Sequence, residues 1–135
     1  MCGIAGFIGR GDRDIIQAMI NEIDYRGPDE KGFFTKEGVF LGHCRLSIID
    51  LKTGGQPMFN EDKNVAVVFN GEIYNFLELK EILLKKGHQF KTQSDTEVIA
   101  HGYEEWGESV FEKMNGMFAV AIWDEKNKKL ILGRD

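Results

Sequence analysis

The sequence is poor in cysteine, basic charge and long apolar runs, and each shortage excludes a class of protein. Its 135 residues include only two cysteines, Cys2 and Cys44, and no CxxC motif or Cys/His cluster, which excludes a disulfide scaffold and a cysteine-based zinc site. The net charge of -5 argues against nucleic acid or an anionic membrane as a partner. No apolar run approaches the roughly 18 residues of a membrane span, and no secretory signal is visible. We expect a single reduced, cytoplasmic domain.

The apolar pattern predicts strands and amphipathic helices in alternation. The continuous apolar runs VAVVF and MFAVAIW are typical of strands covered on both faces. Strands are expected at 2–9, 32–35, 38–49, 65–69, 117–123 and from 130 onward, with a loop at 50–64. Helices are expected at 14–26, 76–86 and 95–106, with a helical turn near 108–113. Short turns between strands favour antiparallel or mixed sheets with helices packed outside them.

Two helix starts carry capping signals, and the end of the chain is unusual. Asn75 is expected to cap the helix over 76–86, and Ser94-Asp95-Thr96-Glu97 has the form of a capping box. The last expected strand, at 130–133, is followed only by two polar residues. We therefore expect an incomplete domain, whose unpaired strand edge or uncovered apolar face promotes self-association, for instance as a homodimer.

Cys2 is the first candidate catalytic residue. Removal of Met1 would place its thiol beside a free α-amine, whose ordinary pKa is about 7.7–8.0. One residue would then supply both nucleophile and base, with no histidine required. The alternative is a small core hydrophobe near the start of the chain, because free cysteine is often buried.

Three further stretches supply complementary groups. Asn70 and Gly71 could offer a side-chain NH₂ and a backbone N–H to an oxyanion, or form a plain Asn-Gly turn. Arg45 could bind a carboxylate bidentately, or face solvent. Asp95, together with Glu72, could pair with an ammonium group, or Asp95 could only stabilise a helix start. Together these groups suit the amide of a free amino acid, namely glutamine.

The sequence resembles the N-terminal glutaminase domain of glutamine-hydrolysing asparagine synthetases, which are class II glutamine amidotransferases of the N-terminal-nucleophile hydrolase superfamily. The resemblance extends along nearly the whole chain and is carried by six motifs in order: MCGIAGF, RGPDEKG, HCRLSIIDLKTGGQPM, FNGEIYNFLELKEIL, SDTEVI and NGMFAVAIWD. It implies an α+β fold, a four-layer sandwich with two antiparallel sheets between helix layers. It also implies hydrolysis of glutamine to glutamate and ammonia through a thioester.

The resemblance assigns roles to individual positions. Cys2 would be the nucleophile, and Asn70 with the Gly71 N–H would form the oxyanion hole. Arg45 would hold the α-carboxylate of glutamine, with backbone near Leu46 and Ile48 lining the pocket. Glu72 and Asp95 would engage the α-amino group. Cys44 stands where the family often has arginine, and strand alternation should point it away from Arg45.

The resemblance also implies what the chain lacks. Residues 1–135 would form the glutaminase domain without its last part and without the synthetase domain, where ATP and magnesium would act. Glutamine hydrolysis itself would need no cofactor. Alternatives are the glutaminase half of another class II amidotransferase, such as glucosamine-phosphate synthase or the purine amidotransferase, and a non-catalytic truncated binding module. His43, His88 and His101 show no metal-ligand spacing, so we expect them on helix or strand surfaces and expect no metal site.

Overall fold

A computed structural model describes residues 2–48 and 50–135 of the chain. In chain order its elements are β1 (Gly3–Ile8), α1 (Arg13–Glu22), the 3₁₀ turn η1 (Asp24–Arg26), β2 (Glu30–Lys36), β3 (Val39–Arg45), β4 (Met58–Phe59), β5 (Val65–Ile73), α2 (Phe76–Lys85), α3 (Glu97–Trp106), the 3₁₀ turn η2 (Gly107–Ser109), α4 (Val110–Lys113), β6 (Gly116–Asp124) and β7 (Lys129–Arg134).

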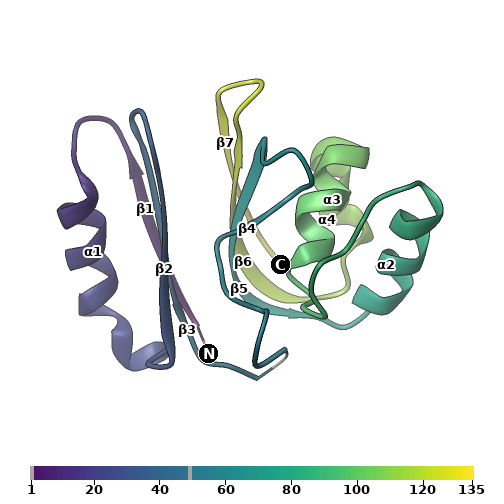
Figure 1. Cartoon of the computed structure of the whole chain (residues 1–135), viewed down its shortest axis with the longest axis horizontal. Helices are drawn as coiled ribbons and strands as arrows, with labels where there is room; N and C mark the ends of the chain where they lie inside the picture. Colours follow the sequence, from purple (N-terminus) through teal and green to yellow (C-terminus); the bar gives the residue numbers. More distant parts are fainter. Residues whose placement is uncertain (1, 49) are drawn as a thin grey trace.

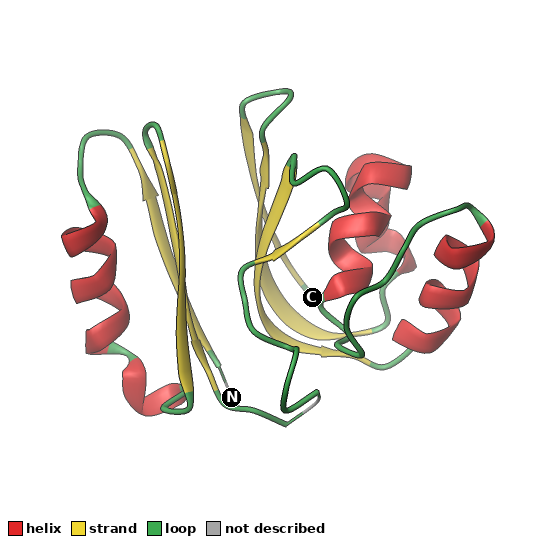
Figure 2. Ribbon diagram, in the orientation of Figure 1, coloured by secondary structure: helices red, strands yellow, loops and turns green. Residues whose placement is uncertain are grey.

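The strands form two antiparallel sheets that face each other. One sheet has the order β1-β3-β2 and the other the order β4-β5-β6-β7. Helix α1 covers the outer face of the first sheet, and α2, α3 and α4 lie on the outer side of the second (Figures 1 and 2). The expected four-layer α+β sandwich is therefore confirmed.

Strand β5 shows why the sequence forms this sandwich. Val67 and Phe69 belong to the core that packs against the helices, whereas Ala66 and Val68 belong to the core between the sheets. Side chains alternate across a strand, so a strand buried on both faces has no polar alternation. This explains the continuous apolar run and confirms the expectation for this strand.

Helix α1 packs on the first sheet through Ile16 and Ile20, both fully buried. The Asp12 side chain accepts a hydrogen bond from the Ile15 N–H at 3.1 Å and caps the helix. Gly42 allows the close approach, since a Cβ there would lie 2.5 Å from Ile20 Cγ1. The helix ends at Glu22, earlier than the expected end at Arg26, and Asp24–Arg26 forms η1.

The packing of α1 predicts a stability effect for Ile20→Ala. Truncation of this fully buried side chain should lower the free energy of unfolding by about 2–5 kcal/mol, because it removes apolar contacts and leaves a cavity. Ile15→Ala, on the same helix but 45% exposed, is the matched control and should cost clearly less. Urea unfolding followed by circular dichroism measures both. Equal losses of unfolding free energy in the two variants would contradict the packing of α1 on the first sheet through Ile20.

Several local predictions were wrong. Regular strand β3 ends at Arg45, so residues 46–48 are not strand, and Ile49 lies outside the described residues. The expected loop at 50–64 contains β4, which pairs with β5. Helix α3 begins at Glu97, and Asn75 makes no side-chain cap hydrogen bond. Ser94 Oγ accepts from the Thr96 N–H at 3.2 Å, but the Ser94 N–H donates to Thr92 Oγ1, so the return bond from Glu97 that completes a capping box is missing. Asn75 instead bonds to Asn115 N–H and to the Lys113 carbonyl oxygen.

Candidate active site

All eight predicted site residues line one pocket. Its lining consists of Cys2, Arg45, Leu46, Ile48, Gly54, Gln56, Phe69, Asn70, Gly71, Glu72, Ser94, Asp95, Thr96 and Met117. These residues come from the position before β1, the end of β3 and the chain that follows it, the later half of β5, the segment before α3 and the start of β6. Cys2 and Met117 are 115 residues apart in sequence, so no local pattern could establish this pocket.

Cys2 is held by the backbone that follows β3. The Leu46 N–H donates to Cys2 Sγ at 3.4 Å, and the thiol faces the Leu46 carbonyl oxygen at 3.7 Å. Arg26 Nε donates to the Cys2 carbonyl oxygen at 3.0 Å. Cys2 is partly exposed and free of any disulfide, so its sulfur is available to a ligand in the pocket.

The segment RGPD, residues 26–29, holds Cys2 and the chain after β3 in place. In addition to the Arg26 bond, Asp29 Oδ2 accepts from the Ser47 N–H at 2.7 Å. Gly27 packs closely on β3, because a Cβ there would lie 2.4 Å from the Cys44 carbonyl oxygen. The segment therefore positions both Cys2 and the chain after Arg45.

Arg45 and Cys44 point in opposite directions, as strand alternation predicts. Cys44 Sγ lies under α1 and donates to the Ile23 carbonyl oxygen at 3.3 Å, and burial raises the pKa of its thiol. Arg45 is only 5% exposed and faces the pocket. Its Nη1 donates to Glu30 Oε2 at 3.1 Å, and its Nη2 donates to the Asp50 carbonyl oxygen. The guanidinium is thus oriented before any ligand enters.

Asn70 and Gly71 lie inside strand β5, which continues to Ile73, so the expected strand end at residue 69 was wrong and the alternative of a plain Asn-Gly turn is excluded. Gly71 is paired with Phe118 of β6. The Phe118 N–H and carbonyl oxygen are both bonded to Asp135 on the other side, at 3.1 and 3.2 Å. Gly71 and Phe118 therefore form a non-hydrogen-bonded pair, and the Gly71 N–H points away from β6.

The neighbouring N–H groups show where the Gly71 N–H points. Two residues before it, Phe69 N–H donates to Gln56 Oε1 at 2.7 Å, and two residues after it, Ile73 N–H donates to Asp95 Oδ2 at 3.0 Å. Alternate residues of a strand direct their N–H groups to the same edge. The Gly71 N–H is therefore directed to the edge of β5 that lines the pocket.

The close strand approach also explains the glycine. A Cβ at position 71 would lie 2.1 Å from the Met117 carbonyl oxygen, a distance that no side chain tolerates. The preceding residue, Asn70, has a buried Oδ1 without a hydrogen-bond partner among the described residues. Buried amide atoms are rarely left unpaired, so an unpaired one at a pocket wall indicates a place for a ligand.

Asp95 and Glu72 supply negative charge to the pocket. Asp95 is 5% exposed, and burial, together with the nearby Glu72 charge, raises the pKa of its carboxyl group although the Ile73 N–H bond opposes the shift. A cation bound beside it would relieve this cost. This part of the pocket therefore suits an ammonium group.

Leu46 and Ile48 form the rim. Ile48 is 63% exposed, and the expected role of the backbone at these two positions stays a prediction.

Sequence reasoning missed Gln56, Ser94 and Thr96. Gln56 Oε1 accepts from the Phe69 N–H, and Gln56 Nε2 donates to Thr96 Oγ1 at 3.3 Å, so this side chain ties β5 to the start of α3. Gln56 lies in a Gly-rich stretch that reads only as loop. The one available signal for Gln56 was its place in the motif HCRLSIIDLKTGGQPM, which is among the six that carry the family resemblance.

His43 is also not where it was expected. It lies on β3 between the sheets and is 1% exposed, so the surface placement was wrong. Burial, followed by the charge of Arg45, lowers the pKa of His43 to about 4 against the effect of the Phe69 carbonyl group. The ring is therefore neutral at pH 7, and its buried Nε2 has no partner among the described residues.

Comparison with known proteins identifies clear relatives. Residues 1–135 match the family model of the glutamine amidotransferase domain. The chain is 46% identical over 140 residues to asparagine synthetase [glutamine-hydrolyzing] 2 of Arabidopsis thaliana, covering all of this chain and 24% of that protein. It is 42% identical over 142 residues to asparagine synthetase [glutamine-hydrolyzing] 1 of Bacillus subtilis, covering all of this chain and 22% of the relative. The chain therefore spans about a quarter of the length of these relatives.

A solved structure shares the fold. Glutamine phosphoribosylpyrophosphate amidotransferase from B. subtilis, in complex with ADP and GMP, superposes with a TM-score of 0.75 and 23% identity over 99% of this chain and 36% of that one. Within the described part of the chain, no helix has the length and apolar character to cross a membrane.

Proposed function

The chain belongs to the glutamine amidotransferase domain family, and from this premise we propose that its pocket hydrolyses glutamine to glutamate and ammonia through a thioester on Cys2. The observation that supports the proposal most directly is the convergence of the Cys2 thiol, the Gly71 N–H edge and the Arg45 guanidinium on one pocket. No cofactor is required for this chemistry, because every step is an acyl transfer.

The reaction begins with the thiol and the α-amine of Cys2 after removal of Met1. The amine accepts the thiol proton, and the sulfur attacks the carboxamide carbon of glutamine. The amine then returns the proton to the leaving nitrogen, ammonia departs and a thioester remains. Water attacks the thioester carbon, the C–S bond breaks and glutamate leaves with the thiol restored.

The oxyanion of each tetrahedral intermediate would be held at the β5 edge. Asn70 supplies a side-chain NH₂ and Gly71 supplies a backbone N–H in a site that is fixed before substrate arrives. Such preorganised donors stabilise charge that develops only in the transition state.

The two charged ends of the substrate would select a free amino acid. The Arg45 guanidinium is positioned for the α-carboxylate, and Asp95 with Glu72 for the α-ammonium, while Leu46 and Ile48 backbone line the rim. A peptide-bound glutamine lacks both charges and should be rejected.

Asp95→Asn tests this recognition. The amide oxygen can still accept from the Ile73 N–H, but the negative charge is lost, so KM for glutamine should rise about 10- to 100-fold, the value of a charge-assisted hydrogen bond, with a smaller change in kcat. Steady-state kinetics with glutamate as the measured product gives both constants. An unchanged KM would contradict the assignment.

Asp95→Asn should weaken glutamine binding without lowering the stability of the protein. Burial raises the folded-state pKa of Asp95 above its ordinary value of 3.8, so the native protein binds more protons than the unfolded chain between these two values. The free energy of unfolding therefore decreases as pH rises through this range. Asp95→Asn lacks this loss and should be no less stable than the parent at pH 7. A higher KM without a lower stability separates ligand binding from a structural role.

The larger assembly is a further part of the proposal. Because the sequence relatives are named asparagine synthetases, we propose that this domain supplies ammonia to a synthetase region, where ATP and magnesium would act. A reduced compartment such as the cytoplasm suits the free Cys2 thiol. Self-association through edge strand β7 stays a prediction.

The direct test is glutamate and ammonia release from glutamine by the chain with Met1 removed. A folded, Met1-free protein that releases neither product would overturn the proposal.

A further inference from the structure

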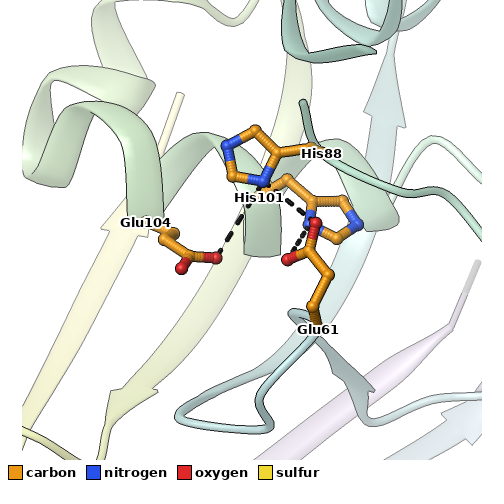
Figure 3. Close-up of side chains that lie close together, drawn as sticks. All are labelled: Glu61, His88, His101 and Glu104. Carbon is orange, nitrogen blue, oxygen red and sulfur yellow. Dashed lines mark hydrogen bonds and ion pairs between the residues drawn. The ribbon is translucent and has the colours of Figure 1, made fainter. Parts of the chain in front are cut away.

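A second group of chemically active side chains lies outside the glutamine pocket, beside α3. Their potential ligand atoms all lie within 4.8 Å of one another, and Figure 3 shows them converging from three segments. The segments are the β4–β5 loop, the chain after α2, and α3 itself. The four residues of this cluster, here called the His/Glu cluster, are Glu61, His88, His101 and Glu104.

His101 is oriented toward the cluster by a buried carboxylate. Its Nε2 lies 3.3 Å from Glu97 Oε1, and its Nδ1 lies 3.0 Å from Glu61 Oε2. Glu97 is itself fixed by the N–H groups of Lys91 and Thr92, at 2.8 and 2.7 Å. A carboxylate that accepts Nε2–H leaves Nδ1 to bind on the other side, the second-shell pattern found behind metal-bound histidines.

His88 has the same arrangement. Its Nδ1 lies 3.1 Å from Glu61 Oε1 and 4.0 Å from Glu104 Oε2, and its Nε2 lies 3.4 Å from Glu105 Oε2. Both histidines therefore direct Nδ1 to the Glu61 carboxylate, and a separate glutamate lies at each Nε2. The histidine rings lie 5.2 Å apart, centroid to centroid.

The contacts between the imidazole nitrogens and the carboxylates need either protons or a metal ion between them. An imidazole Nδ1 lone pair repels a carboxylate oxygen 3 Å away, so each such contact must hold a proton or a metal ion. Four glutamates surround the two rings, counting Glu97 and Glu105, and Lys86 is the one lysine bonded to them, through Glu105 at 2.6 Å, among the residues the structure describes. A divalent ion at the centre would satisfy all four ligands at once.

We propose that the His/Glu cluster binds one divalent transition-metal ion, with zinc preferred. Two imidazole nitrogens and two carboxylate oxygens form a donor set that suits four-coordinate zinc. The Glu61 and Glu104 side chains are 32% and 34% exposed, which provides entry from solvent, whereas the His101 side chain is 1% exposed.

The ion would have a structural role. Four protein ligands leave no open position for a substrate. It would join the β4–β5 loop and the chain after α2 to helix α3, whose preceding residues Asp95 and Thr96 line the glutamine pocket. The proposal is independent of glutamine hydrolysis, since the ligands and the pocket have no residue in common.

The sequence contained only one local signal for this site. His101 and Glu104 are three residues apart on α3 and so share a helix face, whereas Glu61 and His88 are brought in by the tertiary fold. The expectation that His101 lies on a helix surface was wrong, because its side chain is buried.

Zinc titration of the metal-free, tag-free chain tests the proposal. Cys2→Ser is used as background so that the pocket thiol cannot bind the ion, and calorimetry gives stoichiometry and affinity. We expect one zinc per chain, a raised melting temperature, and, with cobalt as probe, the intense visible absorption of tetrahedral coordination. Glu61→Gln and His88→Gln should each abolish stoichiometric binding.

The controls distinguish a metal site from surface attraction. Glu81→Gln, an equal charge change on the exposed face of α2, should bind zinc as the background does. Glu105→Gln should weaken binding about 10- to 100-fold through the His88 ring. Circular dichroism establishes that each variant is folded. A folded background protein that binds no zinc, or variants that all bind equally, would overturn the proposal and leave protons between these groups.

Discussion

Cys2→Ala should abolish glutamine hydrolysis and leave glutamine binding intact. Removal of a covalent nucleophile typically lowers kcat on the order of 10⁶-fold, because no other group in the site can form the intermediate. The groups proposed to bind the substrate's charged ends do not depend on the sulfur. Among the residues that the structure describes, the side-chain hydrogen bonds lost are the two long contacts of Sγ with Leu46, so the fold should persist.

The chain contains its own matched control for this experiment. Cys44→Ala removes the other thiol, which is buried under α1 and bonded to the Ile23 carbonyl oxygen on the opposite face of β3. Glutamine hydrolysis should survive this change, although the loss of a buried side chain should lower the stability. Glutamate release by the Cys2→Ala protein at the parent rate would exclude a thioester on Cys2. Loss of activity in Cys44→Ala alone would show that Cys44 carries the reactive thiol.

The state of Met1 separates an enzyme from a non-catalytic binding module. If Met1 is retained, the Cys2 nitrogen is an amide and cannot act as a base, so this form should bind glutamine without hydrolysing it. Mass spectrometry of the intact protein gives the fraction lacking Met1, and activity should be proportional to that fraction. Full activity in a preparation that retains Met1 would contradict the role of the α-amine.

Local sequence patterns predicted the layers well because the pattern of apolar residues shows whether a strand is buried on one face or on both. The run at Val65–Phe69 has no polar alternation, and the structure places it between a sheet and a helix layer. The opposite orientations of Cys44 and Arg45 likewise follow from strand geometry alone. Residue spacing could not show that Cys2, Arg45, Asn70 and Asp95 meet in one pocket; six ordered motifs and the resemblance they carry supplied that expectation.

The failures have a common physical cause, which is tertiary contact overriding local preference. Asn70-Gly71 has a strong turn preference, yet pairing with β6 keeps it extended within β5. Ser94 to Glu97 has the form of a capping box, but the Glu97 carboxylate bonds to His101, Lys91 and Thr92 instead. Gln56 and the His/Glu cluster depend on partners more than 10 residues away, and no local rule detects them.

Asn70→Ala should lower kcat for glutamine hydrolysis about 10²- to 10³-fold with little change in KM. This is the usual effect of removing one oxyanion donor, because the donor acts on charge present only in the transition state. The change also deletes the buried Oδ1 that has no partner, so stability should not fall through a lost hydrogen bond. Asp95→Asn, expected to act mainly on KM, is the complementary variant in the same pocket.

A double variant provides the sharper test of this assignment. In the Cys2→Ala background no oxyanion forms, so adding Asn70→Ala should leave the glutamine dissociation constant, measured by calorimetry, nearly unchanged. If Asn70 instead holds the substrate in its ground state, the same change should weaken binding in both backgrounds and raise KM in the parent. A tenfold or larger loss of affinity in the double variant would therefore assign Asn70 to substrate binding and leave the Gly71 N–H as the remaining donor at the β5 edge.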